Sequence, residues 1–114
     1  MTETKKDIAK KYFDAFHKGE LDVVFSCLSA NCTVQYGTNE PAEAKPFFLQ
    51  SLEMIKSLEF TTNGIYTSPK SNKVLIDFTY ANSKDKNNTA VQAIDIIEFD
   101  LYNQISKITV IPNE

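Results

Sequence analysis

The chain has 114 residues and a formal net charge of −3 at pH 7, which suits one globular domain spanning 1–114. Its 12 basic residues, all lysines, are outnumbered by 15 acidic ones, so no nucleic-acid partner is expected, because phosphate binding needs a clustered positive excess. The longest apolar run is too short to span a membrane, and the opening segment lacks the apolar core of a signal peptide. The sequence therefore predicts a cytoplasmic protein with no membrane partner.

Three amphipathic helices are predicted in the first half of the chain. In the first of them, over 3–17, Ile8, Tyr12 and Phe16 recur every four residues and form an apolar stripe. Gly19 stands where a helix-ending glycine is expected. The other elements predicted in this half are helices over 21–29 and 43–57 and a short strand over 33–36.

The second half of the chain has an apolar period of two, which predicts β-strands. The candidate strands lie over 59–68, 73–83, 89–100 and 104–111. Because the turns between them are short, we expect an antiparallel meander. The helices and strands together predict an α+β fold, with three N-terminal helices packed on a curved antiparallel β-sheet.

The predicted strand over 89–100 is apolar on both of its faces. One face carries Val91, Ala93, Asp95, Ile97 and Phe99, and the other carries Ala90, Gln92, Ile94, Ile96 and Glu98. Helices can cover only one face of the sheet, and a second copy of the chain is the simplest cover for the other. We therefore expect a homodimer formed through the outer face that includes Gln92, Ile94 and Ile96.

Asp95 is the candidate functional residue that the pattern marks most clearly. Its neighbours on the same strand face are all apolar, so its carboxyl must be protonated, hydrogen-bonded or open to a wet cavity. One interpretation is a hydrogen-bonding group on the floor of a pocket. The other is a buried aspartate that a tyrosine or a backbone amide satisfies, with no ligand.

Four segments and the order of the elements carry a resemblance to a known superfamily. The segments are Lys11–Asp22, Ala30–Tyr36, Ala93–Phe99 and Ile105–Ile108. They resemble the cone-shaped α+β superfamily that includes nuclear transport factor two, the SnoaL-like polyketide cyclases and ketosteroid isomerase. The resemblance covers nearly the whole chain but weakens between Ala42 and Thr67.

The resemblance implies a set of site residues. In ketosteroid isomerase a tyrosine and a protonated aspartic acid donate hydrogen bonds to a carbonyl oxygen while another aspartate moves the proton. The two donors fall on Tyr12 and Asp95, the candidate catalytic residues. The base falls on Tyr36, which departs from the pattern because a phenol is a poor proton acceptor at neutral pH.

The resemblance also implies an aromatic cavity that binds an apolar, carbonyl-bearing small molecule. Its expected wall residues are Phe16, Tyr36, Phe78, Tyr80 and Ile97. An enzyme of this kind would carry out isomerase, cyclase or dehydratase chemistry, and neither a cofactor nor a metal is expected. The alternative is a non-enzymatic dimeric module for protein interaction, with the outer sheet face as the binding surface.

The remaining reactive side chains are given structural roles. His17, in the last turn of the first helix, is expected to complement the helix dipole as a cation. Cys27 and Cys32 are expected to be reduced thiols, Cys27 as a small core residue. Asp77 alternates with apolar strand neighbours and is expected to face the dimer side or solvent.

Overall fold

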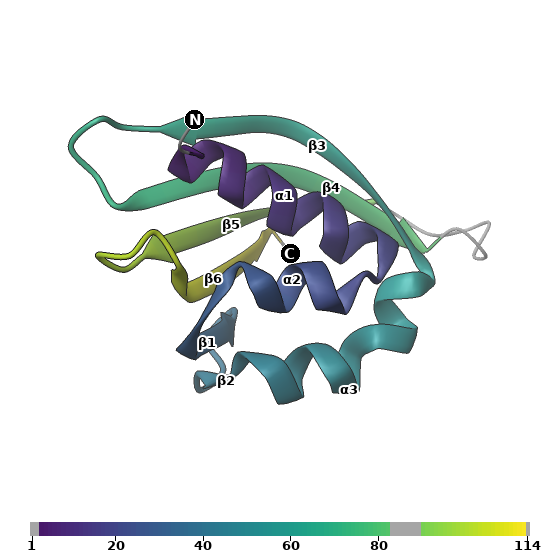
Figure 1. The fold of residues 1–114 in the computed structure, drawn as a ribbon. Helices are drawn as coiled ribbons and strands as arrows, with labels where there is room; N and C mark the ends of the chain where they lie inside the picture. The colour runs from purple at the N-terminus through teal and green to yellow at the C-terminus, as the bar shows by residue number, and fades with distance from the viewer. Residues whose placement is uncertain (1–2, 83–89, 114) are drawn as a thin grey trace.

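The structure is a computed structural model that describes residues 3–82 and 90–113. Within these ranges the chain forms three helices and six strands (Figure 1). In chain order they are α1 (Lys5–Lys18), α2 (Leu21–Ser26), β1 (Leu28–Tyr36), β2 (Ala42–Glu43), α3 (Ala44–Lys56), β3 (Leu58–Thr67), β4 (Lys73–Asn82), β5 (Val91–Phe99) and β6 (Ile105–Asn113). The predicted strand ends at 83 and 89 lie outside the described residues.

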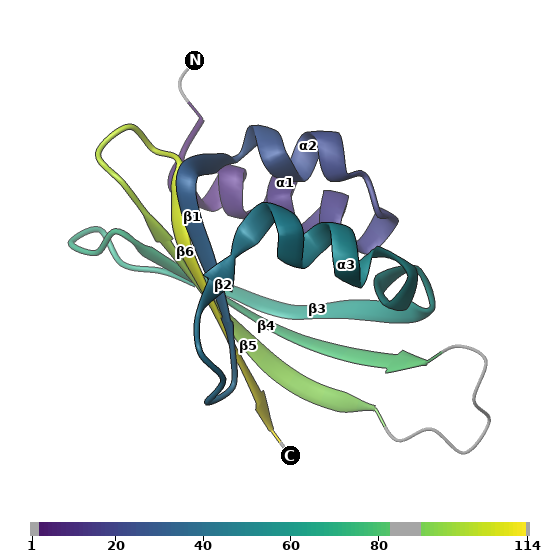
Figure 2. The ribbon, with the colours of Figure 1, turned by 90° about the horizontal axis from the view of Figure 1, so that it is seen from below.

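The strands form one twisted sheet, and the helices cover one of its faces (Figure 2). The strand order is β2-β1-β6-β5-β4-β3. This arrangement confirms the predicted α+β fold. Among the described residues no helix is long and apolar enough to cross a membrane.

The sheet is mixed, which corrects the prediction of a purely antiparallel one. Strands β3 to β6 do form the expected antiparallel meander. However, β1 pairs in parallel with β6, with Val34 opposite Ile108. Such a pairing joins distant parts of the chain, and a rule based on short connections does not detect it.

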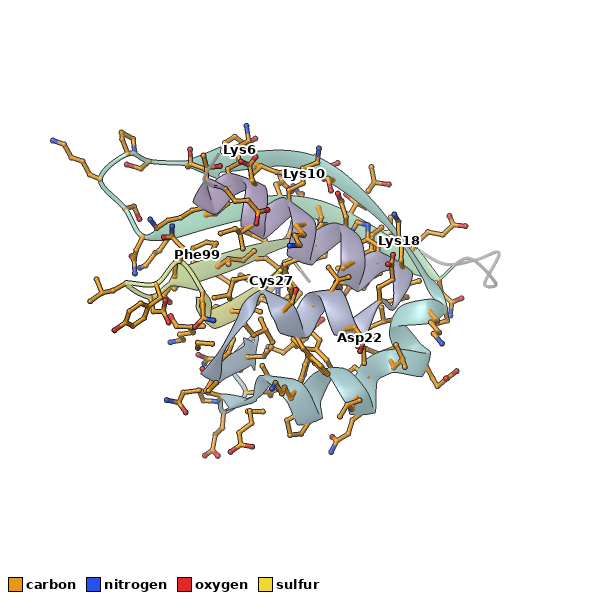
Figure 3. All side chains as sticks on the ribbon, in the orientation of Figure 1. Lys6, Lys10, Lys18, Asp22, Cys27 and Phe99 are labelled. Atoms are coloured by element: carbon orange, nitrogen blue, oxygen red, sulfur yellow. The ribbon has the colours of Figure 1, made fainter. Side chains whose placement is uncertain are left out.

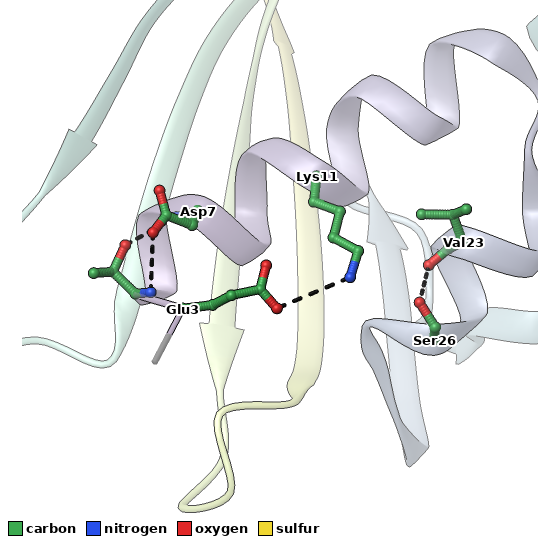
Figure 4. A network of polar contacts seen from close by, with 6 residues as sticks. Glu3, Asp7, Lys11, Val23 and Ser26 are labelled. Carbon is green, nitrogen blue, oxygen red and sulfur yellow. Dashed lines mark hydrogen bonds and ion pairs between the residues drawn. The ribbon is translucent and has the colours of Figure 1, made fainter. Parts of the chain in front are cut away.

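The first turn of α1 is held by reciprocal hydrogen bonds (Figure 4). The Thr4 hydroxyl accepts from the backbone N–H of Asp7, and the Asp7 carboxylate accepts from the backbone N–H of Thr4, both at 3.1 Å. These bonds satisfy two donors at the start of the helix. The helix ends at Gly19, whose φ of 71° is the left-handed conformation that glycine adopts without strain.

The outer surface of α1 is lined by lysines. Lys6, Lys10 and Lys18 are exposed along α1 (Figure 3). The opposite side buries Tyr12 and Phe13 against the rest of the core. This division orients α1 so that its aromatic stripe faces the concave side of the sheet.

Several boundaries differ from the sequence-based expectation, among them the start of β1, which begins at Leu28 and not at 33. The helix expected over 21–29 is shorter in the structure, since α2 ends at Ser26 and Leu28 already pairs with Ile105 on β6. Leu28 is apolar and buried, so its periodicity fits a helix or a strand equally well. The short strand β2, which pairs with β1, is not predicted by the sequence because two residues carry no periodicity.

Candidate functional site

Asp95 lies at the centre of the sheet, on β5, with Ile76 of β4 on one side and Val110 of β6 on the other. Its side chain is 2% exposed. Burial raises the pKa of this carboxyl from its ordinary value of 3.8 to about 8, so the group is mostly protonated at neutral pH. Its Oδ1 atom has no hydrogen-bond partner among the described residues.

Tyr12 enters the same interior from α1 and is also 2% exposed. Its ring packs against Phe16 and Phe48, with ring centroids 6.1 and 6.0 Å away. Burial, and then the negative charge that Asp95 would carry when ionised, raise the pKa of Tyr12 well above its ordinary value. The phenol therefore keeps its proton and can donate it in a hydrogen bond.

A cavity of about 500 Å³ opens between the helices and the concave face of the sheet. Such a volume lies within the range typical of small-molecule sites. Most of the lining is aromatic or aliphatic, and its polar atoms come from a few side chains. The described lining residues are Tyr12, Phe16, Val34, Tyr36, Asn39, Phe47, Phe48, Ser51, Met54, Ile55, Leu58, Phe60, Phe78, Tyr80, Asp95, Ile108 and Val110.

Two of the lining tyrosines meet across the sheet. The hydroxyl oxygens of Tyr36, on β1, and Tyr80, on β4, lie 3.0 Å apart and share a hydrogen bond. Both side chains are half-buried. The resemblance places a base at Tyr36, whereas the structure places a hydroxyl pair there.

The cavity brings together six of the seven site residues expected from the sequence: Tyr12, Phe16, Tyr36, Phe78, Tyr80 and Asp95. Ile97 is the exception. It faces the same side of the sheet but is fully buried, opposite Val74 and Ile108, and it does not line the cavity. Alternation identifies the face of a strand residue but not how far along the strand the cavity reaches.

Several lining residues on α3 are not among the site residues predicted from the sequence. Phe47, Ser51, Met54 and Ile55 follow one another at intervals of four, three and one, which places them on one side of the helix. The helical spacing is visible in the sequence. However, it does not distinguish a face that lines a cavity from one that packs against solid core.

His17 lies in the last turn of α1, as the sequence predicts, and packs there among aromatic rings. Its ring stacks on Phe60 at 4.6 Å and meets the edge of Phe13 at 4.2 Å. Burial lowers its pKa below the ordinary 6.5, against a smaller opposite effect of Asp14. Burial in the aromatic cluster therefore disfavours the cation that the helix-dipole interpretation requires.

The two cysteines are free and buried. Burial raises the pKa of both thiols, that of Cys32 to about 12. Both therefore stay protonated and unreactive near neutral pH. Among the residues that the structure describes, no cluster of His, Cys, Asp and Glu side chains has the arrangement needed for a metal ion.

The outer face of the sheet combines apolar and polar side chains. Gln92 is exposed and donates a hydrogen bond of 3.0 Å to the Asp77 carboxylate, which places Asp77 on this face. Ile94 and Ile96 lie beside it and are half-exposed. The register continues the apolar surface on the neighbouring strands, at Tyr66, Leu75 and Ile111.

Comparison with known proteins rests on the structure alone, since no family model and no curated protein sequence matches the chain. The chain superposes on an NTF2-like protein of unknown function from Cytophaga hutchinsonii with a TM-score of 0.77, at 16% identity, covering 96% of this chain and 100% of that one. It also superposes on SalBIII, an epoxide hydrolase/cyclase-like enzyme of pyran ring formation in the polyether salinomycin (TM-score 0.76, 16% identity, covering 96% and 88% of the two chains). A third match is an LEH-like epoxide hydrolase from M. tuberculosis (TM-score 0.75, 12% identity, 96% and 82%).

The comparisons define the fold class. The similarity extends over 96% of the present chain in each of these three structures. The chain has the NTF2-like fold, and the resemblance drawn from the sequence is confirmed at this level.

Proposed function

We propose that the cavity binds an apolar small molecule carrying a hydrogen-bond acceptor such as a carbonyl oxygen. The observation that supports this function best is the unpartnered, buried Oδ1 of Asp95 at an apolar cavity of about 500 Å³. A buried polar atom without a partner is destabilising. A ligand oxygen held by Asp95 and Tyr12 would remove that cost.

If the bound molecule reacts, the two donors supply the chemistry. A protonated carboxyl and a phenol directed at a carbonyl oxygen stabilise the negative charge that develops there during isomerisation, cyclisation or dehydration. No cofactor is needed for this polarisation. The described lining residues include neither a second carboxyl nor a histidine, so a moving proton would pass through Asp95, water or the substrate itself.

The structural neighbours support this proposal through their fold. Two of them are an epoxide hydrolase/cyclase-like enzyme and an LEH-like epoxide hydrolase. Both are described as enzymes, and both share the fold of the present chain. This likeness supports a small-molecule use of the cavity here. The expected location is the cytoplasm.

The test is binding of a cyclic ketone, 1-tetralone, measured by NMR titration of the labelled protein. Replacing Asp95 with Leu removes the donor, and we expect about tenfold weaker binding, the effect of one hydrogen bond to a buried group. Asp95→Asn retains an N–H donor and should bind nearly as well as the wild type. The hydrocarbon tetralin, which has no acceptor, should bind all three proteins equally. Unchanged ketone affinity in the Asp95→Leu variant would contradict the proposed role.

We further propose a homodimer formed through the outer sheet face, which includes Gln92, Ile94 and Ile96. The support is the contiguous apolar surface there, since such surfaces are typical of interfaces. Ile96→Lys should produce a monomer in size-exclusion chromatography with light scattering. Leu101→Lys, on the turn after β5 and 99% exposed, is the control and should leave the dimer intact. If Ile96→Lys leaves the mass unchanged, the face serves another partner or none.

The second candidate function, a protein-interaction module, is favoured by the same apolar surface. The two candidate functions predict different effects of the Asp95→Leu substitution on binding. A module that acts through the outer face keeps its partner when the cavity is altered, whereas a small-molecule protein loses its ligand. Affinity for the partner and for the ketone in this one variant therefore separates the two functions.

A further inference from the structure

The Tyr36–Tyr80 pair is a second polar position in the cavity, separate from Asp95. Tyr36 on β1 pairs with Val110 on β6, and Val110 in turn pairs with Asp95 on β5. Tyr36 is thus two strands away from Asp95, a backbone separation of about 10 Å. Val110, an apolar lining residue, lies between Tyr36 and Asp95.

Local side-chain sizes explain how the two tyrosines reach each other. Ile76 on β4 pairs with Asp95, and Tyr80 lies four residues further along β4. The two tyrosines therefore approach diagonally over β6 and β5. Ala93 lies between them by register, and it is the smallest inward-facing residue of β5. Its methyl group leaves room for both rings above the sheet.

The chemistry of this pair differs from that of Asp95. A tyrosine hydroxyl has one proton and two lone pairs, so it can donate and accept. Tyr36 makes one hydrogen bond among the described residues, to Tyr80. When Tyr36 accepts the hydrogen bond from Tyr80, its own proton is available to a ligand. When Tyr36 donates that bond, its lone pairs are available to a ligand. It can therefore bind a group that itself both donates and accepts.

An alcohol or phenol hydroxyl is the simplest group of that kind. A purely structural pair would work as well with two phenylalanines, which fill almost the same volume and place no polar oxygen in an apolar wall. Hydroxyls on a cavity surface are in position to select a ligand, because a site built to hydrogen-bond a hydroxyl rejects an analogue that lacks it.

We propose that the ligand is an apolar hydroxy ketone, whose carbonyl meets Asp95 and whose hydroxyl, at the opposite end, meets the Tyr36–Tyr80 pair. This inference rests on the proposed function and adds the second polar group and its position. It makes Tyr36 a specificity-determining residue in place of the proton acceptor that the resemblance assigns to that position.

The test compares two probes that differ by one hydroxyl, 1-tetralone and 6-hydroxy-1-tetralone, by NMR titration at pH 6.5, where the probe phenol is protonated. The wild type should bind the hydroxy ketone about three to ten times more tightly, the effect of roughly one hydrogen bond. Tyr36→Phe should abolish this preference, so that the variant binds the two probes with equal affinity. Tyr102→Phe, at an 85% exposed position on the turn after β5, is the matched control and should keep the preference.

The outcomes separate this inference from the proposed function. Asp95→Leu should weaken both probes by the same factor and so preserve the preference for the hydroxyl. If Tyr36→Phe keeps the wild-type preference, or the wild type shows none, the hydroxy ketone is overturned while ketone binding stands. If neither probe binds the wild type, or if Asp95→Leu has no effect on either, the proposed function fails and the inference fails with it. Tyr80→Phe provides a second variant for the same comparison.

Discussion

The raised pKa of Asp95 predicts that this carboxyl makes the folded protein less stable as the pH rises. In the folded protein the group keeps its proton up to about pH 8, whereas in the unfolded chain it loses it near the ordinary value of 3.8. Unfolding therefore releases a proton between these two pH values. The contribution of this group to stability is fully present below about pH 4 and is lost as the pH rises towards 8.

The size of the effect follows from the two pKa values. Each pH unit between them lowers the free energy of unfolding by about 1.4 kcal/mol, which amounts to about 4 kcal/mol at pH 7. This is a large part of the stability of a typical domain, about 5–15 kcal/mol. Asp95→Asn is neutral at every pH and lacks this dependence. We expect the variant to gain about 4 kcal/mol relative to the wild type between pH 4 and pH 7.

Urea denaturation of both proteins at unit steps from pH 4 to pH 9 measures this difference, because the titration of all other groups cancels. Asp22→Asn, at an exposed position in the first turn of α2, is the control and should follow the wild type. A constant difference between Asp95→Asn and the wild type across this range would refute the reasoning. It would mean that the carboxyl is ionised in the folded protein and that the cavity is wet enough to solvate it.

Three further predictions concern the framework around the site. Thr4→Ala removes the hydroxyl that accepts from Asp7 and should lower the free energy of unfolding in urea by about 1 kcal/mol, while Thr4→Ser should restore it; equal stability of all three proteins would contradict the capping role. Phe48→Ala removes a ring that is 1% exposed and should lower the free energy of unfolding by about 3–5 kcal/mol in the same assay. Leu49→Ala, at a 59% exposed position, should change this free energy little. Similar losses for both variants would place Phe48 outside the core. The His17 ring should titrate in NMR with a midpoint below 6.5 because burial disfavours the cation; a midpoint at or above 6.5 would show that the imidazole is solvated or paired.

Hydrophobic periodicity in the sequence is sufficient to predict the helices and strands that bury one continuous face. The period of Tyr12 and Phe16 identifies α1, and the alternation around Asp95 identifies β5 and its cavity-facing side. Both are long amphipathic segments in which every residue repeats the same signal. The sequence also marks Asp95 as unusual, since a carboxyl among apolar neighbours needs a special environment.

Other features depend on contacts between distant residues, which no local pattern contains. The parallel pairing of β1 with β6 joins Leu28 to Ile105. The cavity excludes Ile97 and includes Ser51 and Met54 because of where α3 lies over the sheet. The hydrogen bond between Tyr36 and Tyr80 spans 44 residues of sequence. Each of these features forms only when the tertiary structure assembles, and side-chain packing determines how it does so.

The parallel pairing of β1 with β6 also has a consequence for biosynthesis. The cavity wall includes Val34 and Tyr36 of β1 and Ile108 and Val110 of β6, yet β1 leaves the ribosome some seventy residues before β6, a separation given by Val34 and its partner Ile108. Contacts between residues so far apart in the sequence form late, and they slow the folding of the chain. The cavity is therefore incomplete in the nascent protein until β6 has emerged, and Asp95 gains its neighbour Val110 only with that last strand.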